Sequence, residues 1–405
     1  MAEKDNLLGL NYLHTKRQNR ALVFKMICTR KQISRIDISR LTGLSKMAIT
    51  NIVNDLIRDK MVVEAGEASD IEKPSSGRRP VYLSADTSVN HVIGLYISRD
   101  YAIATLSNLK CEIQFEERTD FIFEESGDSF TEKIVHLVRD ILNNKKTGNK
   151  KILGIGISCI GPLDSKNGII LEPPNFHKLK SIPLKQILIE KFRLDVVIDN
   201  DMNTSSLAEK LYGNATDLAN FIYVGVTNGI GAGIVTNHEL YEGDMGFGGE
   251  IGHITVNFEG PRCACGNVGC LELYASIPEI VSQAKNSIAL GMASSLKEDD
   301  VITWERIAAH AKKWDGLSIN LIDRLCFYIS IGLTSLVNIL DPQKIFLGHD
   351  ITLAGGYVAE KVQEYINQHI ISAKYKKIPV EISFFNDRAP IAGSAALIID
   401  NLLFR

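Results

Sequence analysis

The sequence contains no long hydrophobic run and little cysteine, and each shortage excludes a class of protein. No uninterrupted apolar stretch reaches the roughly 18 residues that a membrane-spanning helix needs. The first five residues are polar and do not begin the apolar region of a secretion signal. The seven cysteines are odd in number and partly clustered, which fits a reducing compartment better than a disulfide framework. We therefore expect a cytoplasmic protein that does not span a membrane.

The composition is that of an ordinary globular protein, but its charge is unevenly distributed. The 405 residues predict two or three domains, at about 150 residues per domain. Residues 1–90 carry 15 Lys and Arg against 10 Asp and Glu, whereas the remainder carries 30 against 38. Because a basic surface releases counterions when it binds a polyanion, this distribution favours a partner such as DNA at the N-terminal end.

Three of the cysteines, Cys263, Cys265 and Cys270, lie within eight residues, and His253 precedes them by ten positions. A Cys-x-Cys-x4-Cys spacing with one histidine offers Zn²⁺ four ligands in a tetrahedron. Since no coordination position stays open, we expect a structural zinc in a knuckle over residues 253–270. The alternatives are buried apolar thiols, or a disulfide with one cysteine left over, although a Cys-x-Cys pair strains a disulfide.

Two carboxylates flank this cysteine cluster. Glu250 and Glu272 each lie within three residues of a predicted zinc ligand. A bound metal would hold both carboxylates in place, and carboxylates accept hydrogen bonds from sugar hydroxyls. The spacing therefore favours a carbohydrate pocket shaped by zinc.

The first ninety residues predict three helices. Residues 13–30 place apolar residues at helical spacing between basic ones, and residues 34–41 form a second, shorter helix. Thr42-Gly43 ends that helix in a turn, and Ser45 can cap a third because its hydroxyl accepts an exposed backbone N–H. A helix, a short turn with glycine and a second helix make the helix-turn-helix motif.

In that motif the second helix enters the major groove of DNA with its N-terminal residues forward. Here these residues include Lys46, Thr50 and Asn51. Lys46 can contact phosphate or guanine, Thr50 phosphate or a thymine methyl, and Asn51 adenine. We therefore expect these three side chains to contact DNA.

A wing hairpin is predicted after the third helix. Two short extended runs, residues 61–65 and 80–84, flank a loop that contains Arg78 and Arg79. Arginines on a mobile arm suit a narrow, negatively charged minor groove. The alternative is a solvated basic linker between two domains.

The helix-turn-helix, the Gly-Arg-Arg-Pro loop and the cysteine knuckle together resemble the transcriptional regulators of the ROK (repressor, open reading frame, kinase) family. They are similar to bacterial repressors of xylose or N-acetylglucosamine utilisation. The resemblance spans nearly the whole chain, and its most specific motifs are Glu-x-Gly-His at 250–253 and Cys-x-Cys-Gly-x-x-Gly-Cys-x-Glu at 263–272. It implies a winged helix-turn-helix domain over residues 1–86 and a ROK domain over residues 87–405 that binds sugar and dimerises.

The body of the chain alternates strands and helices, which is typical of an α/β fold in two lobes with a cleft between them. The resemblance implies the ribonuclease-H-like fold of the actin and sugar kinase superfamily. We expect strands at residues 91–98, 101–108, 111–117, 151–158, 221–226, 231–236 and 344–347. We expect helices at residues 129–144, 204–212, 302–311 and 317–340, and from residue 391 onward.

The resemblance also assigns roles to polar residues of this cleft. In ROK sugar kinases an aspartate at this position is the general base for the sugar hydroxyl, which makes Asp201 a vestigial base here. Taken alone, Asp201 could be no more than a helix cap. The sugar-binding residues that the family pattern implies are Asn175, Asn200, Asp201, Glu250, His253 and Glu272.

The nucleotide side departs from the kinase pattern in three places. Residues 96–100 read Tyr-Ile-Ser-Arg-Asp where family kinases carry Asp-x-Gly-Gly-Thr. Residues 227–229 read Thr-Asn-Gly in place of Gly-Thr-Gly, and residues 347–350 read Leu-Gly-His-Asp where several glycines are expected. Phosphoryl transfer depends on positioning ATP and its metal, so these changes argue against an enzyme that uses ATP.

The sequence thus favours a sugar-responsive transcription factor, most plausibly a repressor of carbohydrate-utilisation genes. We expect a homodimer, with a tetramer as the alternative, on a palindromic operator whose half-sites lie one helical turn or a multiple apart. The rival interpretation is an ATP-dependent sugar kinase with a fused DNA-binding end. A regulator that responds to a protein partner in place of a sugar is the third.

Overall fold

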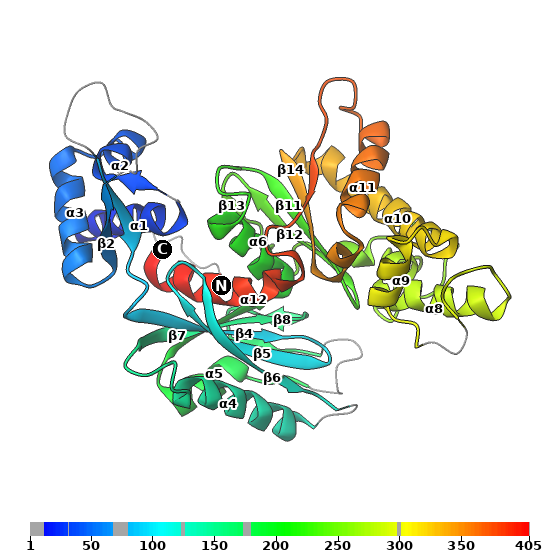
Figure 1. Cartoon of the computed structure of the whole chain (residues 1–405), viewed down its shortest axis with the longest axis horizontal. Helices are drawn as coiled ribbons and strands as arrows, with labels where there is room; N and C mark the ends of the chain where they lie inside the picture. The colour runs from blue at the N-terminus through cyan, green and yellow to red at the C-terminus, as the bar shows by residue number, and fades with distance from the viewer. Residues whose placement is uncertain are drawn as a thin grey trace, which may run out of the picture.

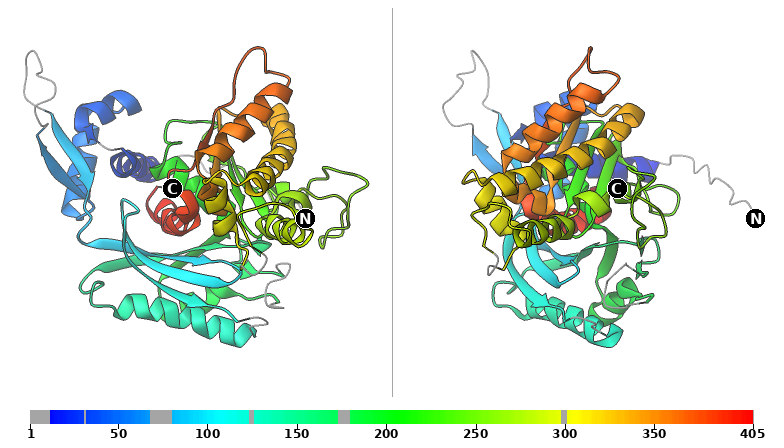
Figure 2. Two further views of the ribbon diagram at one scale, coloured as in Figure 1. Left: turned by 45° about the vertical axis from the view of Figure 1, so that its right-hand side comes forward. Right: turned by 90° about the vertical axis from the view of Figure 1, so that its right-hand side faces the viewer.

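The computed structural model describes residues 12–30, 32–67, 80–122, 126–172, 180–297 and 301–404. A small helical unit lies at one end of the molecule, and two β-sheets with their helices form the rest (Figures 1 and 2). A pair of helices lies between the two sheets. This arrangement confirms the predicted α/β class with two lobes.

The N-terminal unit contains helices α1 (Tyr12–Thr29), α2 (Arg35–Thr42) and α3 (Lys46–Arg58). Strands β1 (Ile33–Ser34), β3 (Val81–Ala85) and β2 (Val62–Glu67) form an antiparallel sheet in that order. The local sequence explains the helix ends. Ser34 begins α2 in a capping box with Asp37, Gly43 ends it at a φ of 71°, and Ser45 begins α3 by accepting the Ala48 N–H. The predicted helices and the turn between them are confirmed.

The first large sheet has the strand order β10-β7-β4-β5-β6. Strands β4, β5 and β6 form an antiparallel meander, and β7 and β10 run parallel to β4. Helices α4 and α5 pack on one face of this sheet (Figure 1). The bounds are Asn90–Ile97 for β4, Tyr101–Asn108 for β5, Ile113–Asp120 for β6, Lys151–Cys159 for β7, Asp195–Asn200 for β10, Gly127–Asn143 for α4 and Leu184–Phe192 for α5. A two-stranded hairpin, β8 (Leu163–Asp164) and β9 (Ile169–Ile170), follows β7.

One predicted boundary in this sheet is wrong. The third strand was expected to begin at Cys111, but β6 begins at Ile113. Cys111 has a φ of 61°, and its N–H donates to the Asn108 carbonyl in the turn that joins β5 to β6. A residue in the left-handed region cannot extend a strand, so the turn is longer than the apolar pattern indicated.

The second large sheet has the order β13-β12-β11-β14-β15 and carries the remaining helices. Its strands are Glu239–Leu240 (β13), Ile230–Thr236 (β12), Phe221–Val226 (β11), Lys344–Gly348 (β14) and Val380–Ile382 (β15). The helices of this lobe are Glu272–Ala275 (α7), Ile277–Ala289 (α8), Trp304–Ala311 (α9), Gly316–Leu340 (α10) and Gly356–His369 (α11), with 3-10 turns at Ile251–His253 (η1), His349–Ala354 (η2) and Asn386–Arg388 (η3). In the described part of the chain, α10 alone is long and apolar enough to cross a membrane, but it packs against α8, α9 and α11 as a core helix.

Helices α6 (Asp201–Tyr212) and α12 (Ala389–Ile399) lie between the two sheets. Small residues let them approach closely: a Cβ added at Gly393 would lie 2.5 Å from the backbone of Thr204. The helix expected at 204–212 begins three residues earlier. Its cap is Asn200, whose side chain accepts the Met202 N–H, so Asp201 is the first helical residue and is not the cap.

The N-terminal unit shares one hydrophobic core with this helix pair. Phe24 of α1 and Leu207 of α6 belong to the same buried cluster, together with residues of α12. Phe24 meets Phe404 of the C-terminal π-helix (Asp400–Phe404) edge to face at 5.9 Å. Ion pairs join Lys25 to Asp400 and Arg30 to Asp217, at 3.5 and 3.6 Å. The helix-turn-helix therefore rests on α6 and the C-terminus and is held there by side-chain packing.

Truncating a side chain of this shared core should destabilise the whole protein. We expect Phe24→Ala to lower the free energy of unfolding by about 3–5 kcal/mol, because Phe24 is 2% exposed and its removal leaves a cavity. Leu22→Ala, at a site 43% exposed on the same helix, should cost less than about 1 kcal/mol. Urea unfolding followed by circular dichroism measures both values. Equal losses of unfolding free energy in the two variants would show that the shared core does not hold α1 in place.

Candidate functional site

Asn200 and Asp201 lie where strand β10 ends and α6 begins, in the interior between the two lobes. The Asn200 side chain is used as the helix cap through its Oδ1, which leaves its Nδ2 free to donate outward from the helix. Asp201 is 3% exposed. A carboxylate this deeply buried has little competition from solvent, so a hydroxyl ligand that reached it would meet it at low dielectric.

Glu250 and Glu272 approach the same point from the second lobe. Burial raises the pKa of Glu250, His253 opposes that shift, and the nearby carboxylates of Asp201 and Glu272 raise the pKa further. The backbone also contributes to the site: a Cβ added at Gly161 would lie 3.0 Å from Asn200 Nδ2 and 3.7 Å from Glu250 Oε1. Four of the predicted sugar-binding residues, Asn200, Asp201, Glu250 and Glu272, therefore converge on one site.

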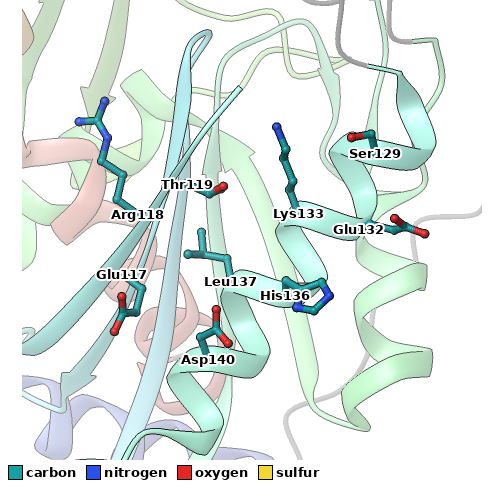
Figure 3. Close-up of a pocket in the computed structure, with 9 residues that line it drawn as sticks. All are labelled: Glu117, Arg118, Thr119, Ser129, Glu132, Lys133, His136, Leu137 and Asp140. Atoms are coloured by element: carbon teal, nitrogen blue, oxygen red, sulfur yellow. The ribbon is translucent and has the colours of Figure 1, made fainter. Parts of the chain in front are cut away.

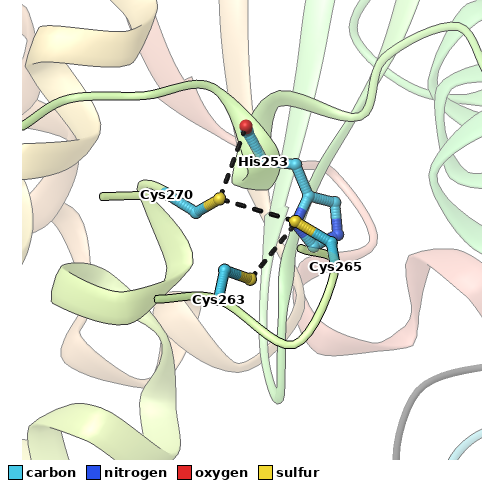
Figure 4. A group of neighbouring side chains, drawn as sticks. All are labelled: His253, Cys263, Cys265 and Cys270. Atoms are coloured by element: carbon cyan, nitrogen blue, oxygen red, sulfur yellow. Dashed lines mark hydrogen bonds between the residues drawn. The ribbon is translucent and has the colours of Figure 1, made fainter. Parts of the chain in front are cut away.

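The predicted zinc ligands also converge, although they come from two separate segments (Figure 4). The ligand atoms of His253, Cys263, Cys265 and Cys270 all lie within 4.8 Å of one another. Cys265 Sγ is 3.7 Å from Cys270 Sγ, and Cys263 Sγ is 3.8 Å from His253 Nδ1. A tetrahedral zinc with bonds of about 2.3 Å requires ligand separations of about 3.8 Å, so these side chains can hold a metal ion.

The knuckle itself is held by backbone pairing. Bridges join Thr255 to Cys270 and Arg262 to Val268, and the Cys263 N–H donates to the Asn267 carbonyl at 2.8 Å. Gly269 adopts a φ of 64°, and a Cβ there would lie 1.7 Å from the Asn257 carbonyl oxygen. The position thus requires glycine for its conformation and for its close packing.

Glu272 connects the knuckle to the cleft. Its Oε1 lies 3.1 Å from Cys263 Sγ and 3.5 Å from His253 Nδ1. The backbone N–H of Asn267 donates to Cys265 and lowers the pKa of that thiol, which favours the thiolate that a metal binds. The cluster that can bind a metal is therefore in direct contact with one of the candidate sugar-binding carboxylates.

The predicted DNA-contacting residues of α3 form an exposed face. Lys46, Thr50 and Asn51 are all exposed, and Met47 beside them is 75% exposed. Ile49, Val53 and Leu56 face inward and hold the helix on α1 and α2. The Thr50 hydroxyl donates to the Lys46 carbonyl at 2.8 Å, so the Thr50 oxygen can still accept a hydrogen bond from a further partner. Asn54, one turn beyond Thr50, is exposed on the same helix.

Three predicted site residues fall outside the described part of the chain. Asn175 lies in the segment 173–179, and Arg78 and Arg79 lie in the segment 68–79. Their roles in binding sugar and DNA rest on the sequence.

A separate surface pocket of about 280 Å³ lies between strand β6 and helix α4 (Figure 3). Its walls carry charges of both signs, including Glu117, Arg118, Lys133 and Asp140. Arg118 stacks on the ring of Tyr101 at 4.0 Å. None of the predicted sugar or metal residues lines this pocket, so it is distinct from the candidate site.

Comparison with known proteins places the chain. The ROK family model matches residues 92–401. The chain belongs to the ROK family. The xylose repressor of Caldicellulosiruptor bescii is 35% identical to it over 401 residues, which cover 97% of this chain and 98% of the relative. The xylose repressor of Bacillus subtilis is 30% identical over 389 residues, 96% of each chain. These names bear out the predicted resemblance to sugar-responsive transcriptional repressors.

Solved ROK structures confirm the fold. A ROK family transcriptional regulator described as a homologue of the Escherichia coli MLC protein superposes with a TM-score of 0.81 at 29% identity, over 96% of this chain and 97% of that one. A ROK family glucokinase from Streptomyces griseus, in complex with glucose and AMPPNP, superposes with a TM-score of 0.67 at 23% identity, over 76% of this chain and 98% of that one. The second likeness shows the shared two-lobed fold alone.

The first predicted departure from the kinase pattern, at Tyr96, lies near the candidate site. Tyr96 is 5% exposed and packs against Ile103 and Ile391. Burial raises the pKa of Tyr96, and the carboxylate of Asp201 raises it further, so this ring lies near Asp201.

The other two departures are bonded to each other. Thr227 Oγ1 donates to Asp350 Oδ2 at 2.5 Å, and Trp304 Nε1 donates to the Asp350 carbonyl at 2.6 Å. Burial raises the pKa of Asp350. Beside it, His349 is 2% exposed, and its Nε2 lies 3.8 Å from Asp201 Oδ2. The sequence predicted that this loop is a lost nucleotide site, which stays a prediction, and it did not predict that His349 is a neighbour of Asp201. The available signal was a histidine at a position where the kinase pattern predicts glycine.

Removing one cysteine of the knuckle should remove its metal. We expect Cys270→Ala to reduce zinc, measured by inductively coupled plasma mass spectrometry, from about one atom per chain to a small fraction of that, because three ligands bind far more weakly than four. The melting temperature should fall by roughly 5 °C or more as the stabilisation by bound metal is lost. Cys326→Ala, a buried cysteine of α10, is the control and should keep its zinc. An unchanged metal content in Cys270→Ala would rule out this site.

Proposed function

We propose that the protein is a sugar-responsive, DNA-binding repressor of transcription in which helix α6 couples the two binding sites. One observation carries this proposal. Helix α6 begins at Asp201 in the cleft, and its second half, with Leu207 and Leu211, packs in the same core as α1 of the helix-turn-helix. A ligand that favours one position of α6 would therefore favour one position of the DNA-reading unit. Such a ligand must bind the two arrangements with different affinities.

The ligand that suits the cleft is a neutral polyhydroxylated molecule. Asp201, Glu250 and Glu272 offer carboxylate oxygens, and Asn200 offers an amide, which together accept and donate to hydroxyl groups. Three carboxylates would repel an anionic ligand such as a sugar phosphate at short range. D-xylose is the first candidate, because the similar proteins of Caldicellulosiruptor bescii and Bacillus subtilis are both named xylose repressors.

We assign a structural zinc to His253, Cys263, Cys265 and Cys270. Four protein ligands would fill its coordination sphere and leave no position for substrate. The metal would fix the knuckle, and with it the orientation of Glu272 toward the cleft, as the contact between Glu272 and Cys263 supports. His253 would contribute to sugar binding in two ways. As a zinc ligand it would help to fix the orientation of Glu272, and as a neighbour of Glu250 it acts on the charge of that carboxylate.

The nucleotide side supports a regulator over a kinase. Tyr96, His349 and Asp350 bring buried side chains to the places where ROK kinases keep glycines and a phosphate-loop carboxylate. Phosphoryl transfer works by positioning phosphates and neutralising their charge, and bulky buried side chains hinder both. Asp201 therefore serves as a hydrogen-bonding group in this proposal and as the base of no reaction.

We further propose that the repressor acts as a homodimer on a palindromic operator. Helix-turn-helix proteins bind two half-sites through two-fold symmetry, with one α3 in each major groove. The second lobe offers an apolar surface for a second copy: Ile339 on α10 and Ile371 beside it are 75% and 84% exposed, and the Ile371 N–H donates to Asn338. A tetramer formed from two such dimers is the alternative. Arg78 and Arg79 complete the proposed DNA contacts from the wing.

Sugar binding can be tested with a conservative change in the cleft. We expect one of D-xylose, D-glucose and N-acetyl-D-glucosamine to raise the melting temperature of the wild type, since a ligand that binds only the folded state stabilises it. Glu250→Gln should weaken that sugar's affinity by roughly tenfold or more, because hydrogen bonds to a charged acceptor are the stronger ones. Glu239→Gln, at an exposed position of β13, is the control. If Glu250→Gln bound the sugar as the wild type does, the assigned cleft would be wrong.

DNA binding can be tested on α3. With a duplex selected from a random pool by the wild-type protein, we expect Lys46→Ala to weaken binding to all sequences and to reduce the salt dependence by about one phosphate contact. Asn51→Ala should weaken the free energy of binding to the selected duplex by about 1–3 kcal/mol and relax the base preference at one base pair. Lys313→Ala, an exposed lysine after α9, should leave fluorescence anisotropy titrations unchanged. If the dependence of DNA affinity on salt concentration were the same in Lys46→Ala as in the wild type, Lys46 would not contact DNA phosphate.

A further inference from the structure

His349 has a backbone conformation that side chains usually avoid. It is the first residue of η2, directly after strand β14, and its φ is 64°. The left-handed region carries a conformational cost for every residue with a Cβ. Two glycines make room for it. A Cβ at Gly225 would lie 2.7 Å from His349 Nδ1, and a Cβ at Gly348 would lie 1.8 Å from the hydroxyl oxygen of Tyr223.

The imidazole of His349 is buried with only one nitrogen bonded. Its Nδ1 lies 3.1 Å from the Tyr223 hydroxyl, and the two rings meet edge to face at 5.9 Å. Its Nε2 has no hydrogen-bond partner among the described residues. A buried polar atom without a partner destabilises the protein, so native structures rarely keep one unless something else occupies the position.

That second nitrogen faces the candidate sugar site. His349 Nε2 is 3.8 Å from Asp201 Oδ2, which is too far for a direct hydrogen bond. At this separation, a single oxygen atom about 2.8 Å from both atoms could form a hydrogen bond with each of them. A sugar hydroxyl can satisfy both partners at once, because it donates its proton to a carboxylate while it accepts from a ring N–H.

We propose that His349 binds the same sugar hydroxyl as Asp201, with the hydroxyl donating to the carboxylate and accepting from the Nε2–H of the imidazole. The proposal rests on sugar binding in the cleft as argued above, and it adds a residue that recognises the ligand. In this arrangement the Tyr223 hydroxyl donates to Nδ1, which leaves the imidazole proton on Nε2. Tyr223 is fully buried, and burial raises its pKa well above the usual value, so the hydroxyl keeps the proton that it donates.

This arrangement gives the repressor a sugar contact on the loop where ROK kinases bind nucleotide. It also joins the two lobes through the ligand, because Asp201 belongs to α6 and His349 follows a strand of the second sheet. The bound sugar would then hold α6 against β11 and β14.

The test combines two changes in the protein with changes in the sugar. Isothermal titration calorimetry is performed with the tightest-binding sugar among D-xylose, D-glucose and N-acetyl-D-glucosamine, and with each of its monodeoxy derivatives. The variants are His349→Asn, which tolerates the left-handed conformation, and His349→Gly, which removes its cost. The matched control is His238→Asn, since His238 also has a positive φ, of 67°, but is exposed in the turn before β13. Zinc content and melting temperature verify that each variant folds.

We expect both His349 variants to bind the parent sugar roughly ten- to hundredfold more weakly than the wild type. One deoxy sugar, which lacks the shared hydroxyl, should bind the wild type more weakly than the parent sugar does, by a similar factor. Its affinity for the His349 variants should be little lower than its affinity for the wild type. His238→Asn should bind every sugar as the wild type does.

Three outcomes would overturn the proposal. Parent affinity unchanged in both His349 variants would show that the histidine does not touch the sugar. Tighter binding in the variants would show that His349 pairs with Asp201 in competition with the ligand. If the affinity loss caused by the His349 variants multiplied the loss caused by every deoxy sugar, no single hydroxyl would depend on His349, and its effect on the cleft would be indirect. If no sugar binds the wild type, the proposed function fails and this inference fails with it.

Discussion

The burial of helix α6 is the constraint on which the rest of the structure depends. Ten of its twelve residues are buried, and many of these are polar, so each needs a partner inside the protein. Thr204 shares a hydrogen bond with Ser158 of the first sheet, and Glu209 accepts from Ser383 of the second lobe. Glu209 is fully buried, and this burial raises its pKa. A helix bonded to both lobes cannot shift without changing both, and the second half of α6 shares a buried core with α1 of the helix-turn-helix.

The candidate site brings together the polar residues that the family pattern predicts for sugar binding. Asn200 and Asp201 sit at the start of α6, while the knuckle positions Glu272 from the other side. Where a kinase needs open backbone for phosphates, this chain has the buried rings of Tyr96 and His349. In the proposed function the site holds one small neutral ligand in place of two substrates. The energy of binding that ligand would then be available to shift α6.

Much of this molecule follows from local rules, and the exceptions have physical causes. The caps at Ser34 and Ser45, the turn at Gly43 and the ligand spacing of the knuckle are short-range patterns, and the structure contains each of them. Helices α5, α8 and α11 and strand β15 were not predicted, because their helical or strand character depends on packing against helices and strands that form elsewhere in the chain. The start of α6 was placed too late because Asn200, rather than Asp201, supplies the cap. The pairing of His349 with Asp201 joins residues 148 positions apart and no local pattern predicts it. The roles of Asn175, Arg78 and Arg79 remain predictions from the sequence.

The central claim is that α6 carries a signal from the cleft to the DNA-reading unit, and hydrogen exchange tests it most directly. Amide exchange is measured by mass spectrometry on the full-length protein with and without the sugar that stabilises it. The account predicts that the sugar changes protection along α6 and also in α1, whose Phe24 and Ile27 lie in the shared core. Changes confined to the cleft and the knuckle, with α1 exchanging as before, would contradict it.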